Sequence, residues 1–170
     1  MTKEVSGDLI PPSKVPWRAR IRAELEKISK GTREHAGHLV GKQFGGPECG
    51  ENLSLQNPNM NTYSPKAIRS EFYCKDGGGT YLQFENELAK MLEDDWKIHI
   101  KVQDKFRIGG QRPFVRKVEV TATPPGGGPK ITKNLDFGNF PSPQSRGEFV
   151  PRKKNFLLMV GASSHPTGNK

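Results

Sequence analysis

Apolar and polar residues alternate along residues 97–106, with apolar side chains at every second position from Ile98 onwards. This period of two predicts a strand with one buried and one solvent-facing side. A glycine-containing turn at 107–111 follows, and the alternation resumes over 114–121, which predicts a second strand. The shorter segment 131–137 is expected to form an edge strand. These three segments together predict an antiparallel sheet.

Two other segments follow the period of a helix. Residues 17–30 carry apolar side chains on one stripe, and Gly31 is placed to end that helix. Residues 81–94 carry a broad apolar face, which predicts a second helix that packs on a core. Between them, residues 32–40 are expected to form a short strand, and residues 52–61 to be irregular at first and then to start a helix near Pro58. The fold class expected for the chain is α+β.

The chain of 170 residues is long enough for one domain with tails. Residues 1–15 are expected to be a lead-in without regular structure, because Pro11 and Pro12 oppose it. Residues 16–140 form the predicted domain. Residues 141–170, rich in Pro, Ser and Lys, form the predicted tail.

The charge of the chain points to polyanionic partners. There are 27 Lys and Arg against 18 Asp and Glu, a formal net charge of +9, and such an excess favours polyanion partners without selecting one. A basic protein without such a partner explains the charge equally well. No apolar run reaches membrane-spanning length, and the first residues lack the apolar stretch of a signal peptide. The expectation is a protein that is intracellular or exported as part of something longer. Cys49 and Cys74 could pair or remain free.

Candidate chemistry gathers after the first predicted helix. His38 follows a glycine, and three side-chain amides come downstream at Asn52, Gln56 and Asn61. Amides are neutral oxygen donors, so this cluster beside an imidazole predicts a hard cation next to a proton acceptor. The alternative is a polar loop that caps its own backbone through Asx turns.

Glu85 stands out on the second helix, because a helical wheel places it inside the apolar face. A carboxylate facing a core is costly unless it is paired, hydrogen-bonded or near a metal. It could pair with one of the arginines, of which Arg116 shares the inward alternation of its strand. It could instead hold water beside a metal ion.

These residues and their spacing resemble the DNA/RNA non-specific endonucleases of the ββα-metal (His-Me finger) class, in the variant found as bacterial toxin domains. The resemblance covers roughly residues 33–121. The matching pattern comprises 36–40, 44–46, Asn52-Leu53, Gln56, Asn61 and 81–89.

The resemblance implies a ββα-metal nuclease core with an antiparallel sheet and flanking helices. His38 then corresponds to the general base and Asn61 to the metal-coordinating asparagine. Glu85 corresponds to the carboxylate that orients metal-bound water. Asn52, counted with the catalytic residues, and Gln56, counted with the nucleic-acid contacts, support the active-site loop and the phosphate. The implied cofactor is Mg²⁺ or another divalent cation such as Mn²⁺.

The chain departs from the better-known motif, Asp-Arg-Gly-His, because His35 and Ala36 hold its first two positions. The role of that arginine is therefore unfilled or moved to Arg33. An apparent insertion before Tyr81 makes Glu71 a competitor of Glu85. The helix also lacks a basic residue at Ala89, four positions after Glu85.

Arg112 and Arg116 lie on or beside the predicted second strand and are further candidates for phosphate binding. His35 could contact a metal or substrate, but an ordinary position at a strand edge is the favoured interpretation. A zinc site built from His35, His38, Cys49 and Cys74 is disfavoured, because no close Cys-x-x-Cys pair is present.

The predicted function is that of a metal-dependent non-specific nuclease acting on DNA, with RNA as a second candidate substrate. The toxin resemblance implies secretion or delivery into the cytoplasm of a target cell, after a cytoplasmic stage before export. It also implies a cognate immunity protein, expected to be acidic, and no membrane partner. The alternative is a non-catalytic basic module that binds nucleic acid.

Overall fold

The computed structural model describes residues 1–16, 22–32, 34–61 and 80–139. Its larger sheet has four antiparallel strands in the order β1-β4-β5-β6. β4 (Lys97–Phe106), β5 (Pro113–Thr123) and β6 (Ile131–Gly138) confirm the three predicted strands, and β6 lies at an edge of the sheet as expected. The predicted tail, residues 141–170, lies outside the described residues.

The other edge of the sheet is formed by β1 (Thr2–Asp8), so the expectation of a lead-in without regular structure is wrong for these residues. β1 pairs with β4 from Thr2 opposite Lys105 to Asp8 opposite His99. Its inward positions include Lys3 and Gly7, so no apolar alternation marks the strand in the sequence. The Lys3 ammonium donates to the carbonyls of Gly50, at 2.8 Å, and Leu53, at 2.7 Å.

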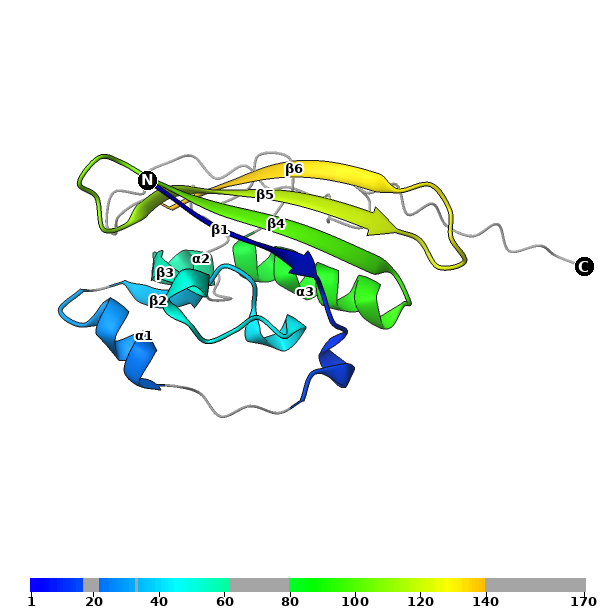
Figure 1. The fold of residues 1–170 in the computed structure, drawn as a ribbon, viewed down its shortest axis with the longest axis horizontal. Helices are drawn as coiled ribbons and strands as arrows, with labels where there is room; N and C mark the ends of the chain where they lie inside the picture. The colour runs from blue at the N-terminus through cyan, green and yellow to red at the C-terminus, as the bar shows by residue number, and fades with distance from the viewer. Residues whose placement is uncertain (17–21, 33, 62–79, 140–170) are drawn as a thin grey trace, which may run out of the picture.

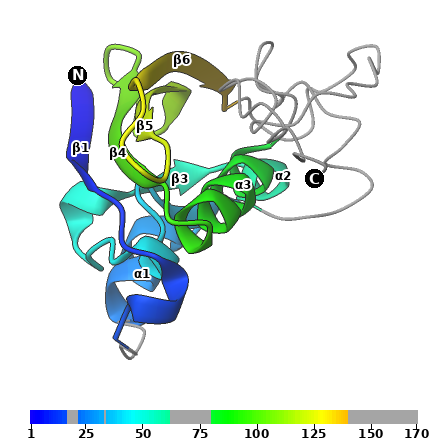
Figure 2. The same ribbon diagram turned by 90° about the vertical axis from the view of Figure 1, so that its right-hand side faces the viewer.

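All the other elements lie on one face of this sheet (Figures 1 and 2). They are α1 (Arg22–Ser29), the antiparallel pair β2 (His35–His38) and β3 (Leu53–Gln56), α2 (Pro58–Asn61) and α3 (Tyr81–Glu93). Short 3-10 turns occupy Pro12–Lys14, Lys42–Phe44 and Gly50–Asn52. The predicted helix over 17–30 is confirmed over α1. The expected strand over 32–40 is shorter, and β3 replaces the irregular start expected for 52–61.

α3 begins and packs as its sequence predicts. Thr80 caps its first turn and forms a capping box with Gln83. The apolar face of α3 is buried against the sheet, where the rings of Tyr81 and Phe137 meet edge to face with centroids 5.2 Å apart. Burying these side chains provides the main stabilisation of the two layers.

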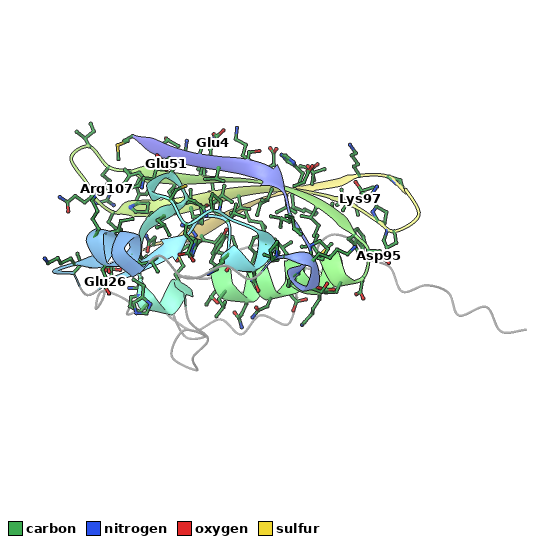
Figure 3. The ribbon with its side chains drawn as sticks, turned by 60° about the horizontal axis from the view of Figure 1, so that its bottom comes forward. Glu4, Glu26, Glu51, Asp95, Lys97 and Arg107 are labelled. Atoms are coloured by element: carbon green, nitrogen blue, oxygen red, sulfur yellow. The ribbon has the colours of Figure 1, made fainter. Side chains whose placement is uncertain are left out.

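The outer face of the four-stranded sheet is mainly polar, and several of its charges are paired across strands. Lys101 lies 3.1 Å from Glu4, which Figure 3 shows on the outer side of β1, and Lys117 lies 3.0 Å from Asp136. Mixed charges of this kind form no single-sign platform for a polyanion. None of the described helices is long and apolar enough to span a membrane.

Candidate active site

The β2–β3 pair positions His38, which closes β2 opposite Leu53. Gly37, just before it, has no side chain because the Gln56 amide occupies that space. A Cβ at Gly37 would lie 2.1 Å from the Gln56 Cδ. The Gln56 Nε2 donates to the His38 carbonyl at 3.2 Å. Gln56 is fully buried, so direct contact with nucleic acid is excluded in this structure, and its task is to position the backbone of His38.

Three consecutive carbonyls, those of His38, Leu39 and Val40, each accept a hydrogen bond from a side chain of another element. The Arg116 Nη1 on β5 donates to the His38 carbonyl at 2.8 Å. The Tyr81 hydroxyl on α3 donates to the Leu39 carbonyl. Burial raises the pKa of Tyr81, so its hydroxyl keeps the proton that it donates. The backbone that carries His38 is therefore fixed from both layers of the fold.

The third carbonyl is bound by Asn52, whose side chain is fully buried. Its Nδ2 donates to the carbonyls of Val40, at 2.9 Å, and Pro47, at 2.8 Å, and its Oδ1 accepts from the Val40 amide at 2.9 Å. These hydrogen bonds hold the loop that follows His38 at Val40 and at Pro47. Asn52 was predicted among the catalytic residues; the structure makes it a residue that shapes the loop instead, because burial keeps its amide away from any substrate.

Arg116 is buried and fully engaged in the same layer. It makes a bidentate pair with Asp104, with both N–O distances 2.8 Å, and its Nη2 is 3.2 Å from the Ser54 hydroxyl. Burial alone would lower the pKa of Arg116, but the charge of Asp104 more than offsets it and the pKa is raised. The prediction that Arg116 binds nucleic acid is wrong, because a guanidinium with 1% exposure cannot reach a phosphate.

Glu85 is buried on α3, as the helical wheel predicts. Among the described residues no arginine forms an ion pair with Glu85, and Arg116 pairs with Asp104 instead. Its Oε1 is buried and has no hydrogen-bond partner among the described residues. Burial raises the pKa of Glu85 to about 7, while the charge of Arg116 and the Gly41 backbone act in the opposite direction. Gly41 allows this approach, because a Cβ there would lie 2.5 Å from Oε1.

His38 and Glu85 line one cavity of about 590 Å³, between α1 and the loop after β2. Glu26, labelled on α1 in Figure 3, marks the helix that borders this cavity. The structure therefore brings together two residues that are 47 positions apart in the sequence. The other described lining residues are Leu25, Ser29, Glu34, His35, Ala36, Gly41, Lys42, Gln43 and Leu82.

Two charged residues near His38 were missed from the sequence. The Glu48 carboxylate lies 3.2 Å from the Lys42 ammonium and 3.9 Å from the His38 Nε2. The side chains of Lys42 and Glu48 are 27% and 7% exposed. The five residues between them include the Gly45-Gly46 bend, which brings the two side chains together. A Cβ at Gly46 would lie 2.0 Å from the Val40 carbonyl oxygen, so the bend requires glycine there.

Arg112 lies beside the same layer with its guanidinium largely engaged. Its Nη2 donates to the Asn139 carbonyl, and its Nη1 lies 3.6 Å from Glu34. Burial lowers the pKa of Arg112, and Glu34 opposes that shift. The Asn139 Oδ1 also accepts from the Asn57 amide at 2.9 Å, just before α2. Arg112 therefore helps to hold the segment that leads to Asn61.

Asn61 closes α2, and its side chain lies outside the described part of the structure, as do Arg33, Glu71 and Cys74. Cys49 is a free cysteine. No group of three or more His, Cys, Asp or Glu among the described residues is arranged to hold a metal ion, and the zinc alternative depends on Cys74, which lies outside them. Two of the predicted metal-site residues remain, Asn61 and Glu85. An amide oxygen and a buried carboxylate oxygen are of the type that hard cations prefer.

The architecture resembles that of proteins of known structure. No known family's sequence profile matches the chain, and no curated protein matches it. Among solved structures, an extracellular endonuclease aligns with 86% of this chain and 76% of its own, at a TM-score of 0.56 and 18% identity. An extracellular nuclease aligns with 82% of this chain and 78% of its own, at a TM-score of 0.51 and 17% identity. The chain shares its α+β fold with these two proteins.

Proposed function

We propose that the chain is a metal-dependent nuclease of the ββα-metal type that hydrolyses phosphodiester bonds in DNA, with RNA as a second candidate substrate. The observation that carries the proposal is the cavity lined by both His38 and the buried Glu85. It occurs in a fold shared with two extracellular nucleases. A cleft that combines an imidazole with a carboxylate of raised pKa is a common form of catalytic site.

In this proposal His38 is the general base. Its imidazole accepts a proton from the water molecule whose oxygen attacks phosphorus. The P–O bond to the 3′ oxygen then breaks, and that oxygen leaves as a 3′ hydroxyl after gaining a proton. The other product carries a 5′ phosphate. The three bound carbonyls at His38, Leu39 and Val40 support this role, because a general base must be held at one distance from the reacting atom.

Asn61 would hold a divalent cation such as Mg²⁺ or Mn²⁺, with Glu85 acting on it through water. The cation would neutralise the charge that builds up on the phosphate. The Glu85 Oε1, buried without a partner among the described residues, fits such a group, because a bound cation would compensate the cost of its burial.

The proposal also covers the partners of the protein and the place where it acts. With a net charge of +9, the chain would hold the nucleic-acid backbone through Lys and Arg, which implies weak sequence preference and binding that weakens with salt. As a secreted toxin domain it would act in the cytoplasm of a target cell. Its producer would then need an immunity protein with a complementary acidic surface.

Plasmid incubated with the protein and Mg²⁺, with and without EDTA, tests the proposal. Cleavage that EDTA suppresses supports the nuclease. The second candidate is a basic module that binds nucleic acid without cleaving it, and the alanine at position 36, where the motif has arginine, favours it. Retardation of the plasmid in a gel without cleavage would select that candidate.

A further inference from the structure

The described lining of the His38 cavity carries more acidic than basic side chains. Its described lining includes three carboxylates, those of Glu26, Glu34 and Glu85. Among the described lining residues, Lys42 is the one Lys or Arg. Arg112 lies 3.6 Å from Glu34, but Glu26 and Glu85 have no ion pair with a described Lys or Arg, and a phosphate is repelled by such carboxylates unless positive charge compensates them. Within the described lining, Lys42 is therefore the side chain that can supply this positive charge.

The arginines that the sequence offers do not supply this charge. Ala36 and Ala89 hold the two positions where the resemblance expects basic residues. Arg116 is buried with Asp104, and Arg112 is engaged by Glu34 and Asn139.

We propose that the Lys42 ammonium contacts the reacting phosphate and that Glu48 positions it there. This inference rests on the proposed nuclease function and assigns to that site a cation that the motif does not contain. An ammonium has three donors, so one lysine can contact a carboxylate and a phosphate oxygen at the same time.

The local backbone fixes the position of Lys42. It opens the 3-10 turn Lys42–Phe44, directly after the Gly41 that touches Glu85. The Gly46 amide donates to the Gly41 carbonyl at 3.2 Å, and Phe44 is buried in the core. The turn therefore presents Lys42 to the cavity from a closed, packed loop.

Glu48 adds a second constraint. Its side chain is 7% exposed, and its Oε1 lies 3.2 Å from the Lys42 ammonium and 3.9 Å from the His38 Nε2. One carboxylate thus lies next to both the candidate base and the candidate phosphate ligand. A nearly buried carboxylate 3.2 Å from the Lys42 ammonium restricts the rotamers of that side chain.

The test compares Lys42→Met, Lys42→Gln, Lys42→Arg and Glu48→Gln with the wild type on duplex DNA and Mg²⁺. Lys42→Met should lower kcat about 10²–10³-fold, the usual effect of removing one group that stabilises developing charge. The Kd for DNA, measured in EDTA, should change less than about threefold. Lys42→Arg should recover part of kcat. Glu48→Gln should lower kcat about 10-fold, and much less when Lys42 is already Met.

The matched control is Lys101→Met, which breaks a lysine–glutamate pair of similar length, 3.1 Å, on the outer face of the sheet. Its kcat should equal that of the wild type. A near-normal kcat in Lys42→Met would overturn the proposal. A weaker Kd with a shallower salt dependence and an unchanged kcat would also overturn it, because that result describes a contact with the DNA backbone away from the reacting phosphate. If kcat falls equally in the Met, Gln and Arg variants and their melting temperatures are lowered, Lys42 has a structural role and the proposal is wrong. Absence of cleavage by the wild type would overturn the nuclease proposal itself.

Discussion

Arg116 donates a 2.8 Å hydrogen bond to the main-chain carbonyl of His38, linking the centre of the large sheet to the candidate base. The same guanidinium pairs with Asp104 and lies over the Tyr81 ring, 4.4 Å from its centroid. A buried charge placed in this way orients its neighbours at a considerable cost in desolvation. Replacing Arg116 or Asp104 should therefore lower the free energy of unfolding.

Arg116→Lys should lower the free energy of unfolding by about 3–5 kcal/mol, because a lysine cannot reproduce the fork to Asp104 and the bond to His38. Urea unfolding followed by circular dichroism measures this. Lys117→Met, which removes an exposed ion pair on the same strand, should cost less than about 1 kcal/mol. A stable Arg116→Lys protein with weakened DNA binding would contradict the structural role.

Gly37→Ala should destabilise the protein by about 1–3 kcal/mol and reduce cleavage. The added Cβ would meet the Gln56 amide, which is buried and has no room to move, so its bond to the His38 carbonyl would be lost. Gly50→Ala is the control, since a Cβ there has no atom within 4 Å. Equal melting temperatures for the two variants would show that the Gln56 contact is unimportant.

Glu85→Gln should change how stability depends on pH. The pKa of Glu85 rises from 4.5 in the unfolded chain to about 7 in the fold, so the folded state favours the protonated acid. Its contribution is fully present below pH 4.5 and is lost as pH rises through about 7, an effect of about 3 kcal/mol at most. The Gln variant should lack this decline. The comparison uses unfolding in EDTA at pH 5 and pH 8, with the exposed Glu119→Gln as control.

Cleavage by the same variant separates Glu85 from its competitor. If Glu85 acts in the reaction, Glu85→Gln loses activity while Glu71→Gln keeps it. The reverse result would move the role to Glu71.

Asn61→Ala should lose cleavage and recover part of it at high Mg²⁺, because the change deletes a proposed metal ligand. Asn59→Ala, two residues earlier in α2, should be mild. Titration of cleavage rate against Mg²⁺ concentration gives both results. Equal losses that no metal concentration restores would indicate a structural segment in place of a metal site.

The elements that the sequence predicted well are those whose patterns are complete. Over β4 the alternation predicts a half-buried strand, and on α3 the helical face is regular enough to reveal Glu85 as an exception. β1 was missed because its inward positions include Lys3 and Gly7, and its partner β4 is nearly 100 residues away.

The site was predicted unevenly for a similar reason. Arg116 was recognised as facing inward, but its partner was not, although Asp104 holds an inward position of β4 directly opposite Arg116 in the strand register. Fixing that register would have revealed the pair. Lys42 and Glu48 meet only through the bend at Gly45-Gly46, whose shape no periodicity describes.

The most direct test is Mg²⁺-dependent cleavage of plasmid DNA by the wild type and by His38→Ala, with His99→Ala as control because His99 is exposed on β4 and does not line the His38 cavity. We expect EDTA-sensitive cleavage by the wild type and a loss of about 10²–10⁴-fold in His38→Ala. DNA affinity in that variant should be nearly unchanged. Near-normal cleavage by His38→Ala would contradict the account.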